Sequence, residues 1–160
     1  MINNEINVLI SENYNEIPDD ILKQTVILRW GFNEEKLDNW VNNMRRDSFG
    51  FTSFYVFALT NNNVIGFAYF CQNETNESQW YYGDLIIHTE HRRSGVATKI
   101  IEHGIQYLKK KNASKLFTYV DKNNNSSIAL HEKLSFSISE SQEPINGFNK
   151  IDRTIYEFRI

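Results

Sequence analysis

Hydrophobic positions recur at helical spacing in two segments near the start of the chain. The first segment, residues 19–30, ends before Gly31, and glycine is common just after the end of a helix. A second helix is predicted from near Asn33, a good capping residue, to around Arg46. The apolar positions that define the first helical face are Ile21, Leu22, Val26, Ile27 and Trp30.

The pattern then changes to apolar runs that are rich in aromatic and β-branched residues, which is typical of strands. Asparagines at 61–63 separate two such runs and predict a hairpin. After Gly95 the apolar residues again fall on one helical face, and a short helix is predicted over 128–134. Strands are predicted at 6–10, 54–59, 64–70, 80–87, 116–120, 136–139 and 154–158.

Helices at both ends of the strand series, with a strand-helix-strand crossover at its centre, predict an α/β or α+β domain around one mixed sheet. A length of 160 residues favours one domain, spanning 1–160, with one sizeable core. Residues 140–152 contain Pro144 and Gly147 and are predicted to form a mobile loop.

Composition narrows the classes of function. A formal net charge of −3 provides no general basic field, so nucleic acid and anionic membranes are not expected partners. Cys71 is the only cysteine, which excludes an intrachain disulfide. The first residues lack the pattern of a signal peptide, and no stretch approaches a membrane span, so a cytoplasmic location is expected.

One segment combines an apolar strand, a basic turn and the start of a helix. It runs from Asp84 to Thr98 with the sequence DLIIHTEHRRSGVAT. The first N–H groups of a helix lack internal partners and lie at the positive end of its dipole, so they can bind a diphosphate. The residues that would add charge, hydroxyl donors or a close backbone approach are Arg92, Arg93, Ser94, Gly95, Val96, Ala97 and Thr98.

This turn, RRSGVA at 92–97, resembles the Arg/Gln-x-x-Gly-x-Gly/Ala motif of the GNAT acetyltransferase superfamily. Residues 124–136, NNSSIALHEKLSF, are similar to that superfamily's second signature, Asn-x-x-Ala-x-x-x-Tyr-x-Lys-x-Gly-Phe. The resemblance covers residues 84–136 and, more loosely, the helices and hairpin before them. It implies a mixed, mostly antiparallel sheet of about six to seven strands flanked by about four helices.

The resemblance also implies that acetyl-coenzyme A (acetyl-CoA) binds where the central strand splays from its parallel neighbour. Ile86, Ile87 and His88 match the strand positions that pair with the pantetheine arm. An N–H group near Ile86 would stabilise the negative charge that develops on the thioester oxygen. The family's β-bulge at this place has no visible signal in the sequence. Asn124, at the Asn of the second signature, would reach the cofactor from the opposite side.

Amine acylation needs a base for the ammonium and an acid for the departing thiolate. His131 stands where the family has its acid Tyr; it would donate a proton as imidazolium or be an ordinary half-buried helix residue. Asp84 is the nearby carboxylate, with three open roles: base, ligand of the substrate amine, or partner of a cation at the strand edge. Ser135 replaces the usual Gly and is expected to strain its turn.

The acceptor is predicted to be a primary amine of a small molecule or a protein. Family members commonly place the acceptor beside the connection between the first two helices, so Trp30 and Glu34 are candidates, together with Tyr81 on the central strand. No metal site is expected, because His88, Glu90 and His91 lack a fourth ligand.

The leading function is direct acetyl transfer in a ternary complex. One alternative is a catalytically weak acyl-CoA binding or regulatory module. It is favoured by His131 in place of Tyr and by the absence of the family's Glu from the central strand, where Tyr81 and Gly83 stand. A toxin that acetylates charged transfer RNA is disfavoured by a pI of about 5.8. The oligomeric state is open, with a homodimer among the alternatives.

Overall fold

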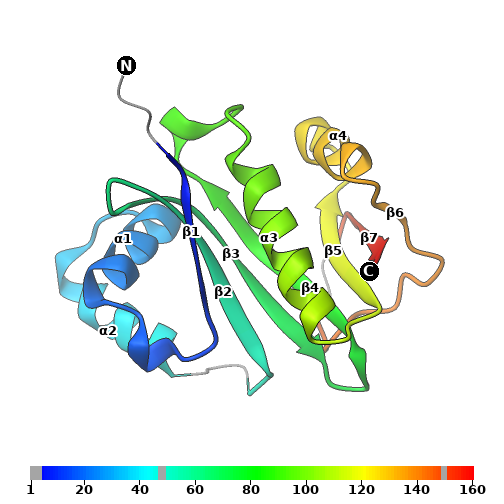
Figure 1. Ribbon diagram of the computed structural model, residues 1–160, viewed down its shortest axis with the longest axis horizontal. Helices are drawn as coiled ribbons and strands as arrows, with labels where there is room; N and C mark the ends of the chain where they lie inside the picture. The colour runs from blue at the N-terminus through cyan, green and yellow to red at the C-terminus, as the bar shows by residue number, and fades with distance from the viewer. Residues whose placement is uncertain (1–4, 47–49, 149–150) are drawn as a thin grey trace.

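The computed structural model describes residues 5–46, 50–148 and 151–160. In these residues four α-helices and two 3-10 helices pack on a seven-stranded sheet (Figure 1). The helices are η1 (Tyr14–Glu16), α1 (Asp19–Trp30), α2 (Glu34–Arg45), η2 (Thr89–His91), α3 (Val96–Lys110) and α4 (Asn125–Lys133). The strands are β1 (Asn7–Ser11), β2 (Ser53–Thr60), β3 (Asn63–Asn73), β4 (Asn76–Ile87), β5 (Lys115–Asp121), β6 (Ser137–Ile138) and β7 (Arg153–Arg159).

The strand order across the sheet is β1-β2-β3-β4-β5-β7-β6. Neighbouring strands run antiparallel except for β4 and β5, which run parallel and are joined through α3. A parallel pair needs such a crossover, because a tight turn can only reverse the chain. In the strand order, this single parallel pair lies at the centre of the sheet, between β3 and β7.

Both faces of the central strands are buried. Phe54 and Phe70 pack with the apolar side of α3, including Ile100, on one face. Phe57 packs with α1, including Leu22, on the other face. Figure 1 shows α3 lying across the sheet, and α1 packs against α2 and β3. Strands covered on two faces need apolar residues at successive positions, which explains why β2 and β3 lack alternation.

Asparagines fix several ends of these elements. The Asn33 side chain accepts a hydrogen bond from Lys36 N at 3.3 Å and caps α2. The Asn124 side chain accepts from Ser127 N at 3.0 Å and caps α4. Asn61 and Asn62 have φ angles of 48° and 63°, the left-handed conformation that a tight hairpin turn requires between β2 and β3.

The predicted architecture is confirmed: the sheet is mostly antiparallel, has seven strands and carries four α-helices. Several bounds differ by one residue and β3 ends three residues later than predicted, while two elements begin at least three residues earlier than predicted. α4 begins at Asn125 rather than at 128, because the Asn124 cap precedes its apolar residues. β4 begins at Asn76 rather than at 80, because its first residues pair with β3 through polar positions that carry no apolar signal.

The predicted loop at 140–152 is partly held in place. Residues 149 and 150 of that segment lie outside the described residues. Ile145 is buried and bridges to Phe148, and its N–H donates to the Tyr119 hydroxyl at 3.0 Å. No helix within the described ranges is long and apolar enough to cross a membrane.

Candidate active site

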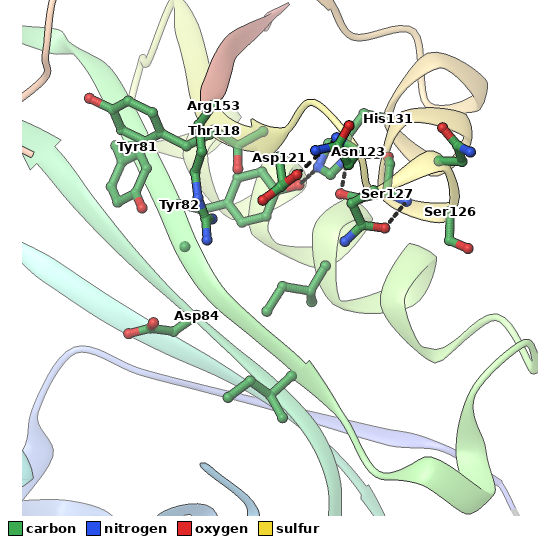
Figure 2. A pocket seen from close by; sticks show the side chains of 16 residues that line it. Tyr81, Tyr82, Asp84, Thr118, Asp121, Asn123, Ser126, Ser127, His131 and Arg153 are labelled. Carbon is green, nitrogen blue, oxygen red and sulfur yellow. Dashed lines mark hydrogen bonds between the residues drawn. The ribbon is translucent and has the colours of Figure 1, made fainter. Parts of the chain in front are cut away.

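The sheet opens along its parallel strand pair. β4 and β5 pair only over residues 79–81 and 115–117, and the last pair is Tyr81 with Phe117. β4 then stays with β3 as far as Ile87, while β5 stays with β7 as far as Asp121. The divergence leaves a cleft of about 780 Å³ (Figure 2). It is lined by residues 81–86, by Thr118, Tyr119 and Asp121, by residues 123–127 and His131, and by Arg153.

A β-bulge shapes the wall of this cleft. Phe67 pairs with Ile86 and Tyr69 pairs with Gly83, so Asp84 and Leu85 together stand opposite one residue of β3. Asp84 has a φ of 54°, in the left-handed region. The bulge leaves Leu85 outside the ladder with β3 and places its backbone at the cleft. It occurs on the strand where the family resemblance implied one.

The backbone beyond the bulge alternates between β3 and the cleft. His88 N donates to Ile65 O at 2.9 Å, so the antiparallel ladder directs the amide of Ile86 toward β3 as well. Ile87 lies between these positions and directs its amide and carbonyl away from β3. Arg92 Nε donates to that carbonyl at 3.2 Å, which agrees with this direction. Leu85 and Ile87, rather than Ile86 and His88, therefore offer N–H groups on the open side of β4.

The turn before α3 has the geometry of an anion site. Gly95 has a φ of 83° and a ψ of 1°, and the first internal bond of the helix runs from Lys99 N to Gly95 O at 3.0 Å. The amides of residues 96–98 therefore precede the helical hydrogen-bond ladder. A β-carbon built at Gly95 would meet no heavy atom within 4 Å, so the space in front of it is open.

The side chains of this turn divide into two groups. Arg92 and Ser94 are tied to the backbone, Arg92 as described and Ser94 through its hydroxyl, which donates to His91 O at 2.5 Å. Arg93 is exposed and has a φ of 61°. Val96 is buried in the core, whereas Ala97 and Thr98 are half-buried in the first turn. The backbone amides and Arg93 are therefore the groups most open to an anion.

His131 forms a buried pair with Tyr82 at the base of the cleft. The Tyr82 hydroxyl contacts His131 Nε2, and His131 Nδ1 donates to Ser127 O at 2.6 Å. Burial raises the pKa of Tyr82, so this phenol keeps its proton and donates it to Nε2. Burial also lowers the pKa of His131, which outweighs the opposing effect of the Ser127 carbonyl. The resting imidazole is therefore neutral, with both nitrogens hydrogen-bonded.

Asp84 already has a cationic partner. Its carboxylate pairs with the guanidinium of Arg29 on α1, and that guanidinium also stacks over the Trp30 ring at 4.5 Å. Tyr81 reaches the same place: a β-carbon built at Gly83 would lie 2.2 Å from the Tyr81 hydroxyl oxygen. Glycine at 83 thus makes room for that hydroxyl beside the bulge. Burial, and secondarily the Asp84 charge, raise the pKa of Tyr81, whereas Arg153 lowers it.

Comparison with known proteins decides the family. Residues 16–136 match the model of the acetyltransferase (GNAT) family. This chain belongs to the GNAT family. No curated protein matches it.

Solved GNAT structures share its fold along nearly the whole chain. An acetyltransferase from Streptococcus agalactiae superposes with a TM-score of 0.70 at 14% identity, covering 96% of this chain and 98% of that one. A GNAT acetyltransferase from Staphylococcus aureus gives 0.68 at 14% identity, covering 97% and 99%. The PaiA N-acetyltransferase from Thermoplasma acidophilum, solved in complex with coenzyme A, gives 0.63 at 13% identity, covering 96% and 99%.

The structure of this GNAT protein brings only part of the predicted site together. Tyr81, Asp84, Ile86, Asn124 and His131 line the cleft. Trp30 is 47% exposed, packs against Trp40 at 5.4 Å and contacts the Arg29 guanidinium, but it does not line the cleft. Glu34 is exposed in the first turn of α2 and does not line the cleft. In the described part of the chain, no three His, Cys, Asp or Glu side chains are grouped as a metal site.

Four cleft features of this GNAT protein were missed by sequence reasoning: the partner role of Arg29, the Tyr82–His131 pair, the space at Gly83 and the entry of Arg153. The glycine next to Asp84 was a usable signal, since glycine within a strand often marks a bulge. Arg29 and Arg153 carried no such signal, because each lies far along the chain from Asp84.

Proposed function

We propose that this chain transfers an acetyl group from acetyl-CoA to a primary amine, directly, within a ternary complex. The observation that carries the proposal is a cleft lined by the bulged strand β4, the same strand that leads through η2 to the open amides at the start of α3. Membership of the GNAT family supports acetyltransferase chemistry in general. The amine acceptor, the direct mechanism and a cytoplasmic site of action are our proposals.

The residues present fit coenzyme A. The open space in front of Gly95 and the amides of residues 96–98 suit a diphosphate, with Arg93 adding a full charge. The free edge of β4 offers Leu85 and Ile87 to the amide groups of a pantetheine arm. Asn124 lies across the cleft, although its side-chain oxygen already caps α4. When bound, acetyl-CoA supplies the thioester whose acetyl group is transferred.

The chain's own groups would act on charge and protons. In the reaction the amine nitrogen bonds to the acetyl carbon, the carbon–sulfur bond breaks, the nitrogen loses a proton and the sulfur gains one. The Leu85 amide, outside the β3 ladder, is placed to donate to the acetyl oxygen as negative charge develops there. We assign the attraction and deprotonation of the ammonium to Asp84, which Arg29 holds at the cleft.

We assign proton return to the sulfur to His131 acting with Tyr82. Because the resting imidazole is neutral, its donated proton has to arrive during turnover from the amine side. The Tyr82 hydroxyl can give its proton to His131 Nε2 while it accepts the proton that the amine loses. In the reverse transfer, His131 returns a proton to the Tyr82 oxygen and the hydroxyl gives its own proton to the thiolate. His131 thus remains the proposed proton donor, but it acts through the Tyr82 hydroxyl.

Thiol release from acetyl-CoA, measured with a thiol reagent in the presence and absence of a panel of amines, tests the proposal. We expect amine-dependent release and an acetylated amine detectable by mass spectrometry. The variant Glu34→Gln is a suitable control, since this exposed residue lies outside the cleft and should leave the rate unchanged. Coenzyme A binding with no amine-dependent release from any amine would contradict the proposal.

A catalytically weak acyl-CoA binding module is the second candidate. Two observations favour it: Asp84 is already neutralised by Arg29, and His131 is held neutral. Both candidates predict tight coenzyme A binding, so only turnover separates them.

A further inference from the structure

Arg153 lines the cleft and has no anionic partner among the residues that the structure describes. Arg153, the first residue of β7, lines the cleft, and Figure 2 shows its guanidinium reaching toward β4, near Tyr82 and above Asp84. Asp121 is its cross-strand neighbour, but Asp121 Oδ1 accepts from Asn123 N at 2.8 Å. Among residues 5–46, 50–148 and 151–160, Arg153 makes no ion pair and no side-chain hydrogen bond.

The phosphates of coenzyme A are too distant to pair with this guanidinium. Arg153 faces the wall formed by residues 81–86, whereas the anion site begins beyond Ile87. A strand advances about 3.3 Å per residue, so the stretch from Gly83 to Ile87 alone separates the two places by about 13 Å. The pantetheine arm and an acetyl group carry no charge. An anion that pairs with Arg153 in the cleft would therefore belong to the other substrate.

The groups around Arg153 suit a second, positive charge on that substrate. The Tyr81 hydroxyl and the Asp84 carboxylate lie at the Gly83 bulge, on the wall that Arg153 faces. The charge of Arg153 lowers the pKa of the Tyr81 hydroxyl, while that of Asp84 raises it, so both charges act on this part of the cleft. One wall of the cleft thus offers a carboxylate for an ammonium and a guanidinium for a carboxylate.

We propose that Arg153 binds a carboxylate of the acceptor, so that the acceptor class is an amine that also carries a carboxylate, as an amino acid does. This inference rests on the proposed function and narrows its substrate. A guanidinium presents paired N–H donors that match the two oxygens of a carboxylate. Arg153 is then a specificity-determining residue, and the Asp84–Arg29 pair receives the amine end.

Matched acceptors that differ only in the carboxylate test the inference. Phenylalanine and phenethylamine form one pair, and leucine and 3-methylbutylamine form another, with rates corrected for the fraction of free amine at the assay pH. We expect kcat/KM to favour the amino acid at least about tenfold, as one charge-assisted contact allows. Arg153→Gln should remove that preference through a higher KM for the amino acid, while the KM of the plain amine changes little. Arg153→Lys should retain part of it.

Arg159→Gln is the control, since Arg159 lies on the same strand, is 79% exposed in its side chain and does not line the cleft. It should keep the full preference. Equal kcat/KM for both members of each pair in the unmodified protein, or an equal loss for both in Arg153→Gln, would overturn the inference while leaving amine acetylation intact. Failure of every amine while coenzyme A still binds is a different pattern, and it overturns the proposed function and this inference together.

Discussion

Replacing Gly95 by Glu should abolish tight binding of coenzyme A while leaving the protein folded. The φ of 83° is unfavourable for any residue with a β-carbon, which costs about 1–2 kcal/mol of stability. No steric cost adds to this, because a β-carbon at this position meets nothing within 4 Å. For a domain of this length, such a loss lowers Tm by roughly 2–8 °C.

The loss of affinity should be larger than the loss of stability. The new carboxylate would stand in the space in front of the α3 amides and repel the phosphates. Losing one charge-assisted hydrogen bond costs about 1.5–3 kcal/mol, which corresponds to a roughly 10- to 150-fold weaker Kd. Like-charge repulsion adds to this value, so at least about a hundredfold loss is expected.

Gly147→Glu provides the matched control for this experiment. Gly147 also has a positive φ, 72°, with nothing within 4 Å of an added β-carbon, but it lies in the segment before β7. Both variants should lose similar stability in thermal unfolding, and only Gly95→Glu should lose coenzyme A affinity in calorimetric titration. An unchanged Kd for folded Gly95→Glu would refute the assignment of the phosphate site.

The remaining predictions concern the cleft and its supports. His131→Phe should lower kcat about a hundredfold, which is the lower end of the range for loss of a general acid or base. The Kd of coenzyme A should not change. The rate of thiol release measures the first quantity and calorimetry the second. Burial lowers the pKa of His131 below its ordinary value of 6.5, so below about pH 6.5 the unfolded chain binds more protons than the folded one. The free energy of unfolding should therefore fall by up to about 1.4 kcal/mol for each pH unit below that value. Denaturant unfolding of His131→Phe should show a weaker fall. Ser135→Gly should raise stability by about 1 kcal/mol in the same unfolding assay, because Ser135 has a φ of 67°; no gain would indicate that this turn is unstrained. Gly83→Ala should displace the Tyr81 hydroxyl, raising the acceptor KM about tenfold while coenzyme A affinity is kept, and an unchanged KM would show that this hydroxyl does not contact the acceptor.

Local patterns were enough to predict the α-helices and strands of this fold, but not its two short 3-10 helices. The helix over 19–30 was predicted with the bounds that α1 has, because its apolar positions and Gly31 act within the segment itself. The turn before α3 was predicted as an anion site for the same reason, since its glycine, its two arginines and the helix start are adjacent. Ser135 has the left-handed conformation that its place in the glycine position implied.

Contacts between distant segments account for what could not be predicted. Asp84 was recognised as a functional candidate, but its pairing with Arg29 spans 55 positions of sequence and depends on where α1 packs. His131 was considered as a charged donor; its neutral state follows from burial and from Tyr82, which lies 49 positions away. Arg153 enters the cleft only because β7 pairs with β5 along its length.

A structure of the protein with coenzyme A bound tests the central claim most directly. We predict that the diphosphate lies within hydrogen-bond distance of the amides of residues 96–98, and that the pantetheine arm runs along Leu85 and Ile87 toward His131. Coenzyme A bound elsewhere on the protein, or a diphosphate out of reach of those amides, would contradict the account.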